Sequence, residues 1–233
     1  MELLECKNLS KSFDNKKILK DVNLIIPRGK IIGLLGKNGQ GKTTLLKLIN
    51  DLLTPTSGEV LIEGKHPGVE SKRIISYLPE RTYLDKEMKV IDTLNYFKEF
   101  YDNFDINKAK KLLKDLDLDI NYKISKMSKG MQEKLQLILV MSREADLYIL
   151  DEPLGGVDPA TRDYILHTIL SNFDTGKSSL LISTHLITDV ESILDDVIMI
   201  NEGKIVTAES VDAIREGHGQ SVNEYFKEVF KCY

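Results

Sequence analysis

Residues Gly36-Lys37-Asn38-Gly39-Gln40-Gly41-Lys42-Thr43 form the stretch that decides the fold. They match the phosphate-binding pattern GxxxxGK[ST]. The stretch follows a continuous apolar run, Ile31 to Leu35, which is typical of a strand buried on both faces. A helical pattern begins at Lys42 and continues to about Asn50. This order of strand, glycine-rich turn and helix predicts a phosphate-binding loop in an α/β protein.

The glycines of this loop allow backbone N–H groups to converge on phosphate oxygens at a helix N-terminus, where the helix dipole favours an anion. Lys42 is expected to reach the β- and γ-phosphates, and Thr43 to ligate Mg²⁺. A dinucleotide-binding fingerprint fits less well, because Lys-Thr follows Gly41 where that pattern needs a later glycine. The residues expected to contact the nucleotide here are Lys37, Asn38, Gly39, Gln40, Gly41, Lys42, Thr43 and Thr44.

A second candidate for chemistry is an acidic pair at the end of an apolar run. Leu147 to Leu150 is followed directly by Asp151 and Glu152. Alone, such a pair is equally compatible with a solvated turn. Beside a phosphate loop it gains meaning, because ATP hydrolysis needs a carboxylate near Mg²⁺ and a base near the attacking water. We therefore expect Asp151 to bind the metal and Glu152 to act as the base.

The rest of the chain alternates between strand and helix patterns. Val90 to Met141 has helical spacing throughout, and Val197 to Val206 resembles a hairpin around Glu202-Gly203. The pattern predicts a mostly parallel α/β core with a helical insertion, and two short helices at the end. Further strands are expected at Leu3–Lys7, Val22–Ile26, Glu59–Ile62, Arg73–Leu78, Leu147–Leu150 and Ser179–Ser183, and a helix at about Pro159–Ser171.

Composition limits the classes of function. A chain of 233 residues with 42% hydrophobic residues can bury the core of one globular domain. A net charge of −4 argues against a sequence-independent nucleic-acid binder, so no nucleic acid is expected as a partner. Cys6 and Cys232 form no metal-spaced cluster. No apolar run approaches the roughly 20 residues that span a bilayer, so any membrane function would need a second chain.

Three further motifs make a family resemblance specific. Met127-Ser128-Lys129-Gly130-Met131-Gln132 resembles the signature LSGGQ of ATP-binding-cassette (ABC) proteins. Leu154 to Pro159 is similar to the D-loop, with Asp158, and Ser183-Thr184-His185 is similar to the segment that carries the switch histidine. With the phosphate loop and the acidic pair, the ordered motifs resemble ABC transporter ATP-binding subunits, and most of all the small-exporter (ABC-2 type) cassettes with separate membrane subunits.

The resemblance implies a P-loop NTPase core with a mostly parallel sheet, an N-terminal antiparallel β subdomain and a helical insertion. Residues 1–233 would be one ABC ATPase domain, with the nucleotide-binding core at about 1–84 and 142–208. Residues 85–141 would be the insertion that carries the signature, and 209–233 a helical tail. The implied activity is ATP hydrolysis, with Mg²⁺, coupled to transport, and the implied direction is export by a membrane-spanning subunit. The cassette would lie peripherally at the cytoplasmic face of the cell membrane, as a homodimer or a heterodimer with a paralogous cassette.

The resemblance also implies roles for individual residues. Phe13 would stack on adenine, His185 would be catalytic, and Ser128, Gly130 and Asp158 would contact ATP across a dimer. Three residues have simpler alternatives, since Phe13 also suits a core position, Ser128 a helix N-cap and His185 an ordinary surface position.

Departures from the family pattern leave other roles open. Lys129 and Met131 replace usual signature residues, and Glu80 stands where the Q-loop glutamine is expected. Glu80 would ligate Mg²⁺ and touch the nucleotide, or else face solvent or a membrane subunit. A soluble, non-transport ABC ATPase remains the alternative, whereas a chromosome-structure ATPase would carry a long heptad insertion and a translation factor two motif sets.

Overall fold

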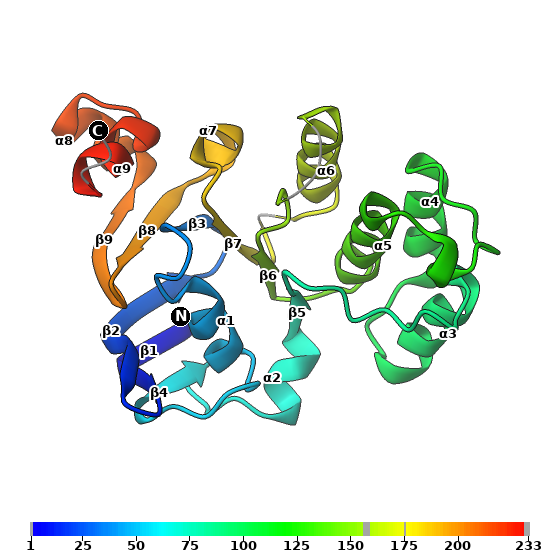
Figure 1. Ribbon diagram of the computed structural model, residues 1–233, viewed down its shortest axis with the longest axis horizontal. Helices are drawn as coiled ribbons and strands as arrows, with labels where there is room; N and C mark the ends of the chain where they lie inside the picture. Colours follow the sequence, from blue (N-terminus) through cyan, green and yellow to red (C-terminus); the bar gives the residue numbers. More distant parts are fainter. Residues whose placement is uncertain (1, 156–158, 175, 231–233) are drawn as a thin grey trace.

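The computed structural model describes residues 2–155, 159–174 and 176–230, which form two sheets flanked by helices (Figure 1). In chain order the elements are β1 (Glu2–Phe13), β2 (Lys16–Pro27), β3 (Ile31–Leu35), α1 (Lys42–Ile49), β4 (Ser57–Ile62), α2 (Val69–Ile74), β5 (Ile75–Leu78), α3 (Val90–Phe100), α4 (Ile106–Asp115), η1 (Ile124–Lys126), α5 (Lys129–Met141), β6 (Leu147–Asp151), α6 (Pro159–Ser171), β7 (Ser179–Thr184), α7 (Ile187–Val190), η2 (Glu191–Ile193), β8 (Asp196–Asn201), β9 (Lys204–Ser210), α8 (Val211–His218) and α9 (Val222–Val229).

The larger sheet determines where the functional residues meet. It has six strands in the order β5-β6-β7-β3-β8-β9, and only β9 runs antiparallel to its neighbour. Every residue of β3, β6 and β7 is buried, which explains their continuous apolar runs. Because parallel strands end at one edge, the segments that follow β3, β6 and β7 converge there, where α/β proteins commonly bind ligands.

The smaller sheet is antiparallel, in the order β2-β1-β4, and covers one face of the larger sheet. Its side chains share a core with α1 and with inward residues of β3, such as Ile32 and Leu34. Asp14 adopts φ 49° in the tight turn between β1 and β2. The predicted N-terminal antiparallel subdomain and the α/β fold class are therefore confirmed.

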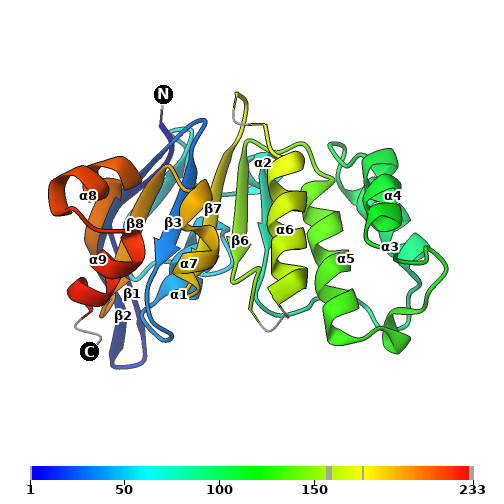
Figure 2. The same cartoon turned by 90° about the horizontal axis from the view of Figure 1, so that it is seen from above.

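Helices α3, α4 and α5 lie together beyond the β5–β6 end of the larger sheet (Figure 2). Arg143, just after α5, ties them to that sheet: its guanidinium donates to the carbonyl oxygens of Ile75 at 2.7 Å and Lys72 at 2.9 Å, and to Asn103 Oδ1 at 3.2 Å. The same group lies 3.9 Å from the ring centroid of Tyr101. A buried guanidinium with this many acceptors fixes the helices against the sheet.

The C-terminal helices α8 and α9 lie at the opposite end of the molecule (Figure 2). Glu191 accepts hydrogen bonds from the backbone N–H groups of Val222 at 2.9 Å and Asn223 at 3.3 Å, and so caps the start of α9. The end of α9 reaches the phosphate loop, where Lys37 Nζ lies 3.4 Å from the carbonyl oxygen of Phe230.

Several predicted elements are confirmed, among them the strand Ile31–Leu35, the helix Pro159–Ser171, the β8–β9 hairpin and the two closing helices. The strand expected from Arg73 was wrong at its start, since Arg73 and Ile74 end helix α2. The Ser71 hydroxyl closes the start of that short helix, because it accepts from the Gly68 N–H and donates to the Gly68 carbonyl oxygen, both at 2.9 Å.

Candidate active site

The phosphate loop joins β3 to α1 in a backbone shape that only glycines suit. Gly39 and Gly41 have φ values of 80° and 107°, in the left-handed region. A Cβ atom at Gly36 would lie 2.7 Å from the carbonyl oxygen of Ile200. Gly41 is also the N-cap of α1 and has no side chain with which to cap it. The first N–H groups of α1 are therefore available to an anion.

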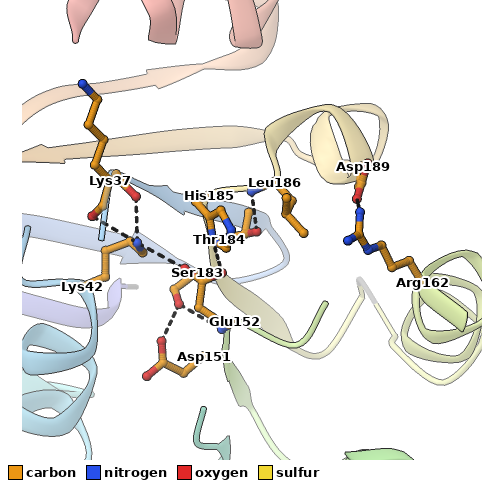
Figure 3. A network of polar contacts seen from close by, with 11 residues as sticks. Lys37, Lys42, Asp151, Glu152, Arg162, Ser183, Thr184, His185, Leu186 and Asp189 are labelled. Atoms are coloured by element: carbon orange, nitrogen blue, oxygen red, sulfur yellow. Dashed lines mark hydrogen bonds and ion pairs between the residues drawn. The ribbon is translucent and has the colours of Figure 1, made fainter. Parts of the chain in front are cut away.

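Lys42 lies across the mouth of this loop and is only 5% exposed. Its ammonium donates to the Gly36 carbonyl at 2.7 Å and lies 3.2 Å from Glu152 Oε1 (Figure 3). A buried ammonium is costly unless it is paired, and these partners satisfy it. Lys42 is thus held in the loop with its charge directed at the carboxylate that follows β6.

Asp151 ends β6 and is 1% exposed. Its Oδ1 accepts a hydrogen bond of 2.5 Å from Ser183 Oγ. Its Oδ2 is buried without a hydrogen-bond partner among the described residues. Burial raises the pKa of Asp151, the hydroxyls of Ser183 and Thr43 lower it, and the charges of Glu80 and Glu152 raise it further.

Glu152 connects the acidic pair to His185. Its backbone has φ 51°, and its N–H donates to the carbonyl oxygen of Ser183 at 3.0 Å. Glu152 Oε2 lies 2.9 Å from Nδ1 of His185, the residue that follows β7 (Figure 3). One carboxylate therefore contacts both Lys42 and the predicted switch histidine.

A cavity of about 510 Å³ unites the phosphate loop with Phe13. Phe13 ends β1, and its ring is 44% exposed, with Lys11 Nζ 4.9 Å from the ring centroid. A second cavity of about 270 Å³ adjoins it, and Asn38, Glu80 and Glu152 line both. The walls of the first cavity are Phe13, Lys16, Ile18, Asn38, Gly39, Gly41, Lys42, Thr43, Thr44, Glu80 and Glu152.

Some predicted site residues lie elsewhere. Ser128 caps α5 by accepting the N–H of Met131 at 3.3 Å, so the capping interpretation is correct. The described walls of both cavities include neither Ser128 nor Gly130. The side chain of Lys37 points away from Lys42 toward Phe230 (Figure 3). Asp158 lies outside the described residues.

Gln40, one of the predicted nucleotide contacts, has another partner in the structure: its Oε1 accepts the backbone N–H of Glu202, which ties the loop to the β8–β9 turn. The structure also adds residues that the sequence did not single out as site residues. Glu133 and Gln136 of α5 line the second cavity. Ser183, noted in the sequence only as the neighbour of His185, bonds to Asp151. The motif Ser-Thr-His marked this segment, but only the pairing of β6 with β7 places Ser183 opposite Asp151.

Comparison with known proteins agrees with this geometry. The profile of the ABC transporter family matches residues 19–155. The chain is 31% identical over 218 residues to the ABC transporter ATP-binding protein YtrB of Bacillus subtilis (strain 168), covering 92% of this chain and 74% of that protein. It is 32% identical over 212 residues to the lantibiotic transport ATP-binding protein SrtF of Streptococcus pyogenes, covering 90% and 92%.

Solved structures show the same relationship. The ATP-binding subunit of an ABC transporter superposes with a TM-score of 0.88 at 29% identity, over 98% of this chain and 99% of that one. A nucleotide-free ABC cassette shares the fold with a TM-score of 0.75 at 22% identity, over 94% and 96%. These relatives support the transporter interpretation over the soluble, non-transport alternative. The chain belongs to the ABC transporter family and is an ATP-binding subunit that hydrolyses ATP to drive transport.

Proposed function

We propose that the 510 Å³ cavity holds ATP, with its base against Phe13 and its phosphates against the start of α1. The observation that carries this proposal is that one cavity joins the exposed ring of Phe13 to the start of α1, where no side chain caps the backbone N–H groups. The ring offers a stacking surface for a base, and the loop offers N–H groups for phosphate. Lys42, now held by Glu152, would turn its charge to the phosphates when they arrive.

Mg²⁺ fits the residues beside this cavity. Asp151 Oδ2 is a buried oxygen without a partner among the described residues, and Thr43, whose side chain carries a hydroxyl, lines the 510 Å³ cavity. Both are hard oxygen ligands of the kind that Mg²⁺ prefers. No group of three or more His, Cys, Asp or Glu side chains among the described residues could hold a metal. Phosphate oxygens and waters would complete the coordination, as is usual for Mg²⁺, and the ion would offset phosphate charge.

In the proposed hydrolysis, Glu152, His185 and Lys42 each have a separate role. Glu152 accepts a proton from the attacking water while that water's oxygen bonds to the γ-phosphorus and the β–γ bridging bond breaks. His185, 2.9 Å from Glu152 Oε2, holds the carboxylate in position. Lys42 stabilises the charge that collects on the phosphoryl oxygens. The products are ADP and phosphate.

Ser128 and Gly130 do not line the cavity of their own chain, so we assign them to the ATP of a second cassette. Both lie at the start of α5, where backbone N–H groups favour an anion. The proposed dimer is two copies of this chain or this chain with a paralogous cassette. ATP between the two subunits would hold them closed, and its hydrolysis would release them.

Glu80→Gln tests whether Glu80 serves the metal. Glu80 lines both cavities, and its charge acts on Asp151, so it lies close enough to influence Mg²⁺. A carboxylate is a better Mg²⁺ ligand than an amide, so the variant should need more Mg²⁺ for half-maximal ATPase activity. An exposed charge contact is typically worth about 0.7 kcal/mol, which corresponds to about a 3-fold increase in the Mg²⁺ requirement. Titration of Mg²⁺ against ATPase rate measures this, and superimposable curves would leave Glu80 without a metal role.

A membrane-spanning partner is proposed because relatives of this chain are named as ATP-binding proteins of transport systems. No helix in the described parts of this chain is long and apolar enough to cross a membrane. We place the partner at a groove of about 420 Å³ bounded by α1, β5 and α3. Two of its aromatic residues are exposed, Phe100 at 67% and Tyr83 at 44%, and Leu52 in the same groove is 55% exposed. Such an apolar surface beside the site suits a docked segment of another protein.

We further propose that the transporter exports its substrate. SrtF is described as a lantibiotic transport protein, and the SkfA peptide export ATP-binding protein SkfE of Bacillus subtilis (strain 168) is 30% identical, over 88% of each chain. The cassette would act peripherally at the cytoplasmic face of the cell membrane. Mass spectrometry of proteins that co-purify with the intact chain from its native membrane would identify the membrane subunit.

Phe100→Asp tests the groove. A carboxylate in an apolar contact loses hydration without a partner, so recovery of the membrane subunit in co-purification should fall by about 10-fold or more, equivalent to about 1.4 kcal/mol. ATPase activity of the isolated cassette should remain unchanged. Tyr122→Asp is the matched control, because Tyr122 is a half-exposed aromatic at 37% on the same insertion but outside the groove. Equal recovery of the membrane subunit by both variants would move its contact elsewhere.

A further inference from the structure

We infer that Ser183 is a positioning residue that orients both carboxylates of the acidic pair, presenting Asp151 to the metal and Glu152 to the attacking water. This inference rests on the proposed function, since it concerns how that site is aligned. It assigns a role to a hydroxyl whose residue is not among those that line the two cavities of the site.

The position of Ser183 follows from strand pairing. β6 and β7 are adjacent and parallel, and their register places Ser183 beside Asp151. Ser183 is completely buried, at 0% exposure. Its hydroxyl donates to Asp151 Oδ1 at 2.5 Å and accepts from the N–H of Glu152 at 3.2 Å (Figure 3). A hydroxyl has a single proton to donate, so that proton is committed to Asp151.

The bond to Asp151 determines which carboxylate oxygen remains for a ligand. Ser183 engages Oδ1, whereas Oδ2 is buried and without a partner among the described residues. Without Ser183, the carboxylate would be free to rotate, and Oδ2 would no longer be held out for the metal. Hydrogen bonds to a ligating carboxylate commonly tune metal affinity in this way.

The bond to Glu152 stabilises an unusual backbone. Glu152 has φ 51°, a left-handed backbone conformation that residues other than glycine adopt at a cost in free energy. Its N–H is shared between the carbonyl oxygen of Ser183 at 3.0 Å and the Ser183 hydroxyl at 3.2 Å. This backbone turn directs the Glu152 carboxylate to Lys42 and His185. Ser183 therefore helps to fix the direction of the proposed base.

Ser183→Ala and Ser183→Cys test this role in the full-length chain. Alanine removes the donor, and cysteine keeps similar volume but replaces a strong donor with a weak one. Ser179→Ala is the matched control: Ser179 begins the same strand, is also 0% exposed, and donates to the carbonyl oxygen of Pro27 at 2.8 Å, away from the site.

Two measurements separate positioning from packing. The first is the Mg²⁺ concentration for half-maximal ATPase activity. The second is the Mg²⁺ dependence of binding of a fluorescent ADP analogue, which needs no turnover. We expect Ser183→Ala to raise the Mg²⁺ requirement by about 10-fold in both measurements, with a smaller shift in the same direction for Ser183→Cys. Ser179→Ala should retain the wild-type Mg²⁺ requirement in both.

Unchanged Mg²⁺ dependence in both Ser183 variants would overturn the inference. Parallel losses of activity and unfolding temperature in Ser183→Ala and Ser179→Ala, with no shift in Mg²⁺ dependence, would also overturn it, because they would indicate packing alone. If Ser183→Ala does not fold, Ser183→Cys decides the question by itself. Failure of the proposed function would be seen separately, as a wild-type chain without Mg²⁺-dependent ATP hydrolysis.

Discussion

Glu152→Gln is expected to lower ATP turnover by at least about 100-fold while leaving ATP bound, because the amide cannot accept a proton from water. The side chain is almost isosteric, so the bond to His185, now 2.9 Å long, can be replaced by an amide contact. Loss of the negative charge also frees Lys42, whose ammonium lies 3.2 Å from Glu152, to bind phosphate. ATP affinity should therefore be maintained or increased.

The same variant should accumulate as an ATP-bound dimer. Single-turnover ATPase assays measure the rate, and size-exclusion chromatography with and without ATP measures the dimer. Glu216→Gln on α8 is the control, since this glutamate is exposed and distant from the site along the chain. Near-normal hydrolysis by Glu152→Gln would remove Glu152 from the role of base.

Gly130→Asp is expected to reduce ATPase activity by about 100-fold while the monomer still binds ATP. The reason is that the shared site would bring the new carboxylate against the γ-phosphate. At an effective dielectric constant near 20, two unit charges about 4 Å apart repel by about 4 kcal/mol. The structure indicates that this substitution affects the shared site and not the fold of the monomer. A Cβ atom at Gly130 meets no atom within 4 Å, and Gly130 lies in the first turn of α5, where an acidic residue stabilises a helix. The fold of the monomer should be unaffected.

Two controls isolate the charge. Gly130→Ala adds a side chain without charge, and Gly68→Asp adds the charge at another helix start with equally open surroundings. Both should retain most activity. ATP binding is measured at low protein concentration, and ATPase rate across a range of protein concentrations. Activity in Gly130→Asp that is independent of protein concentration would show that the site is complete within one chain.

The sequence predicted the parts of this molecule that depend on local patterns. The buried strand Ile31–Leu35 is marked by a continuous apolar run between glycine-containing turns, and the structure confirms its bounds. β1 and β2 are longer than predicted. Their prediction depended on alternation between buried and exposed positions, and this pattern weakens toward the strand ends. Helix α2 was missed because a glycine and a serine, rather than an apolar period, define its start.

The site itself was only partly predictable. Each motif identified a segment, but contacts between segments depend on strand order, which no short pattern encodes. The pairing of Ser183 with Asp151, the contact of Lys37 with Phe230 and the bond of Gln40 to Glu202 all join residues far apart in the chain. The roles proposed for Ser128, Gly130 and Glu80 remain predictions, since they concern a second subunit or a metal.

The strand order also bears on how the protein is made. β3 is the first strand of the large sheet to leave the ribosome, yet both its neighbours, β7 and β8, come from residues 179–201. At about 5–20 residues per second, β3 waits roughly ten to thirty seconds for them. The early antiparallel sheet and α1 can cover one face of β3 meanwhile, but its edges stay unpaired and prone to aggregation. The ATP site is thus a late product of translation.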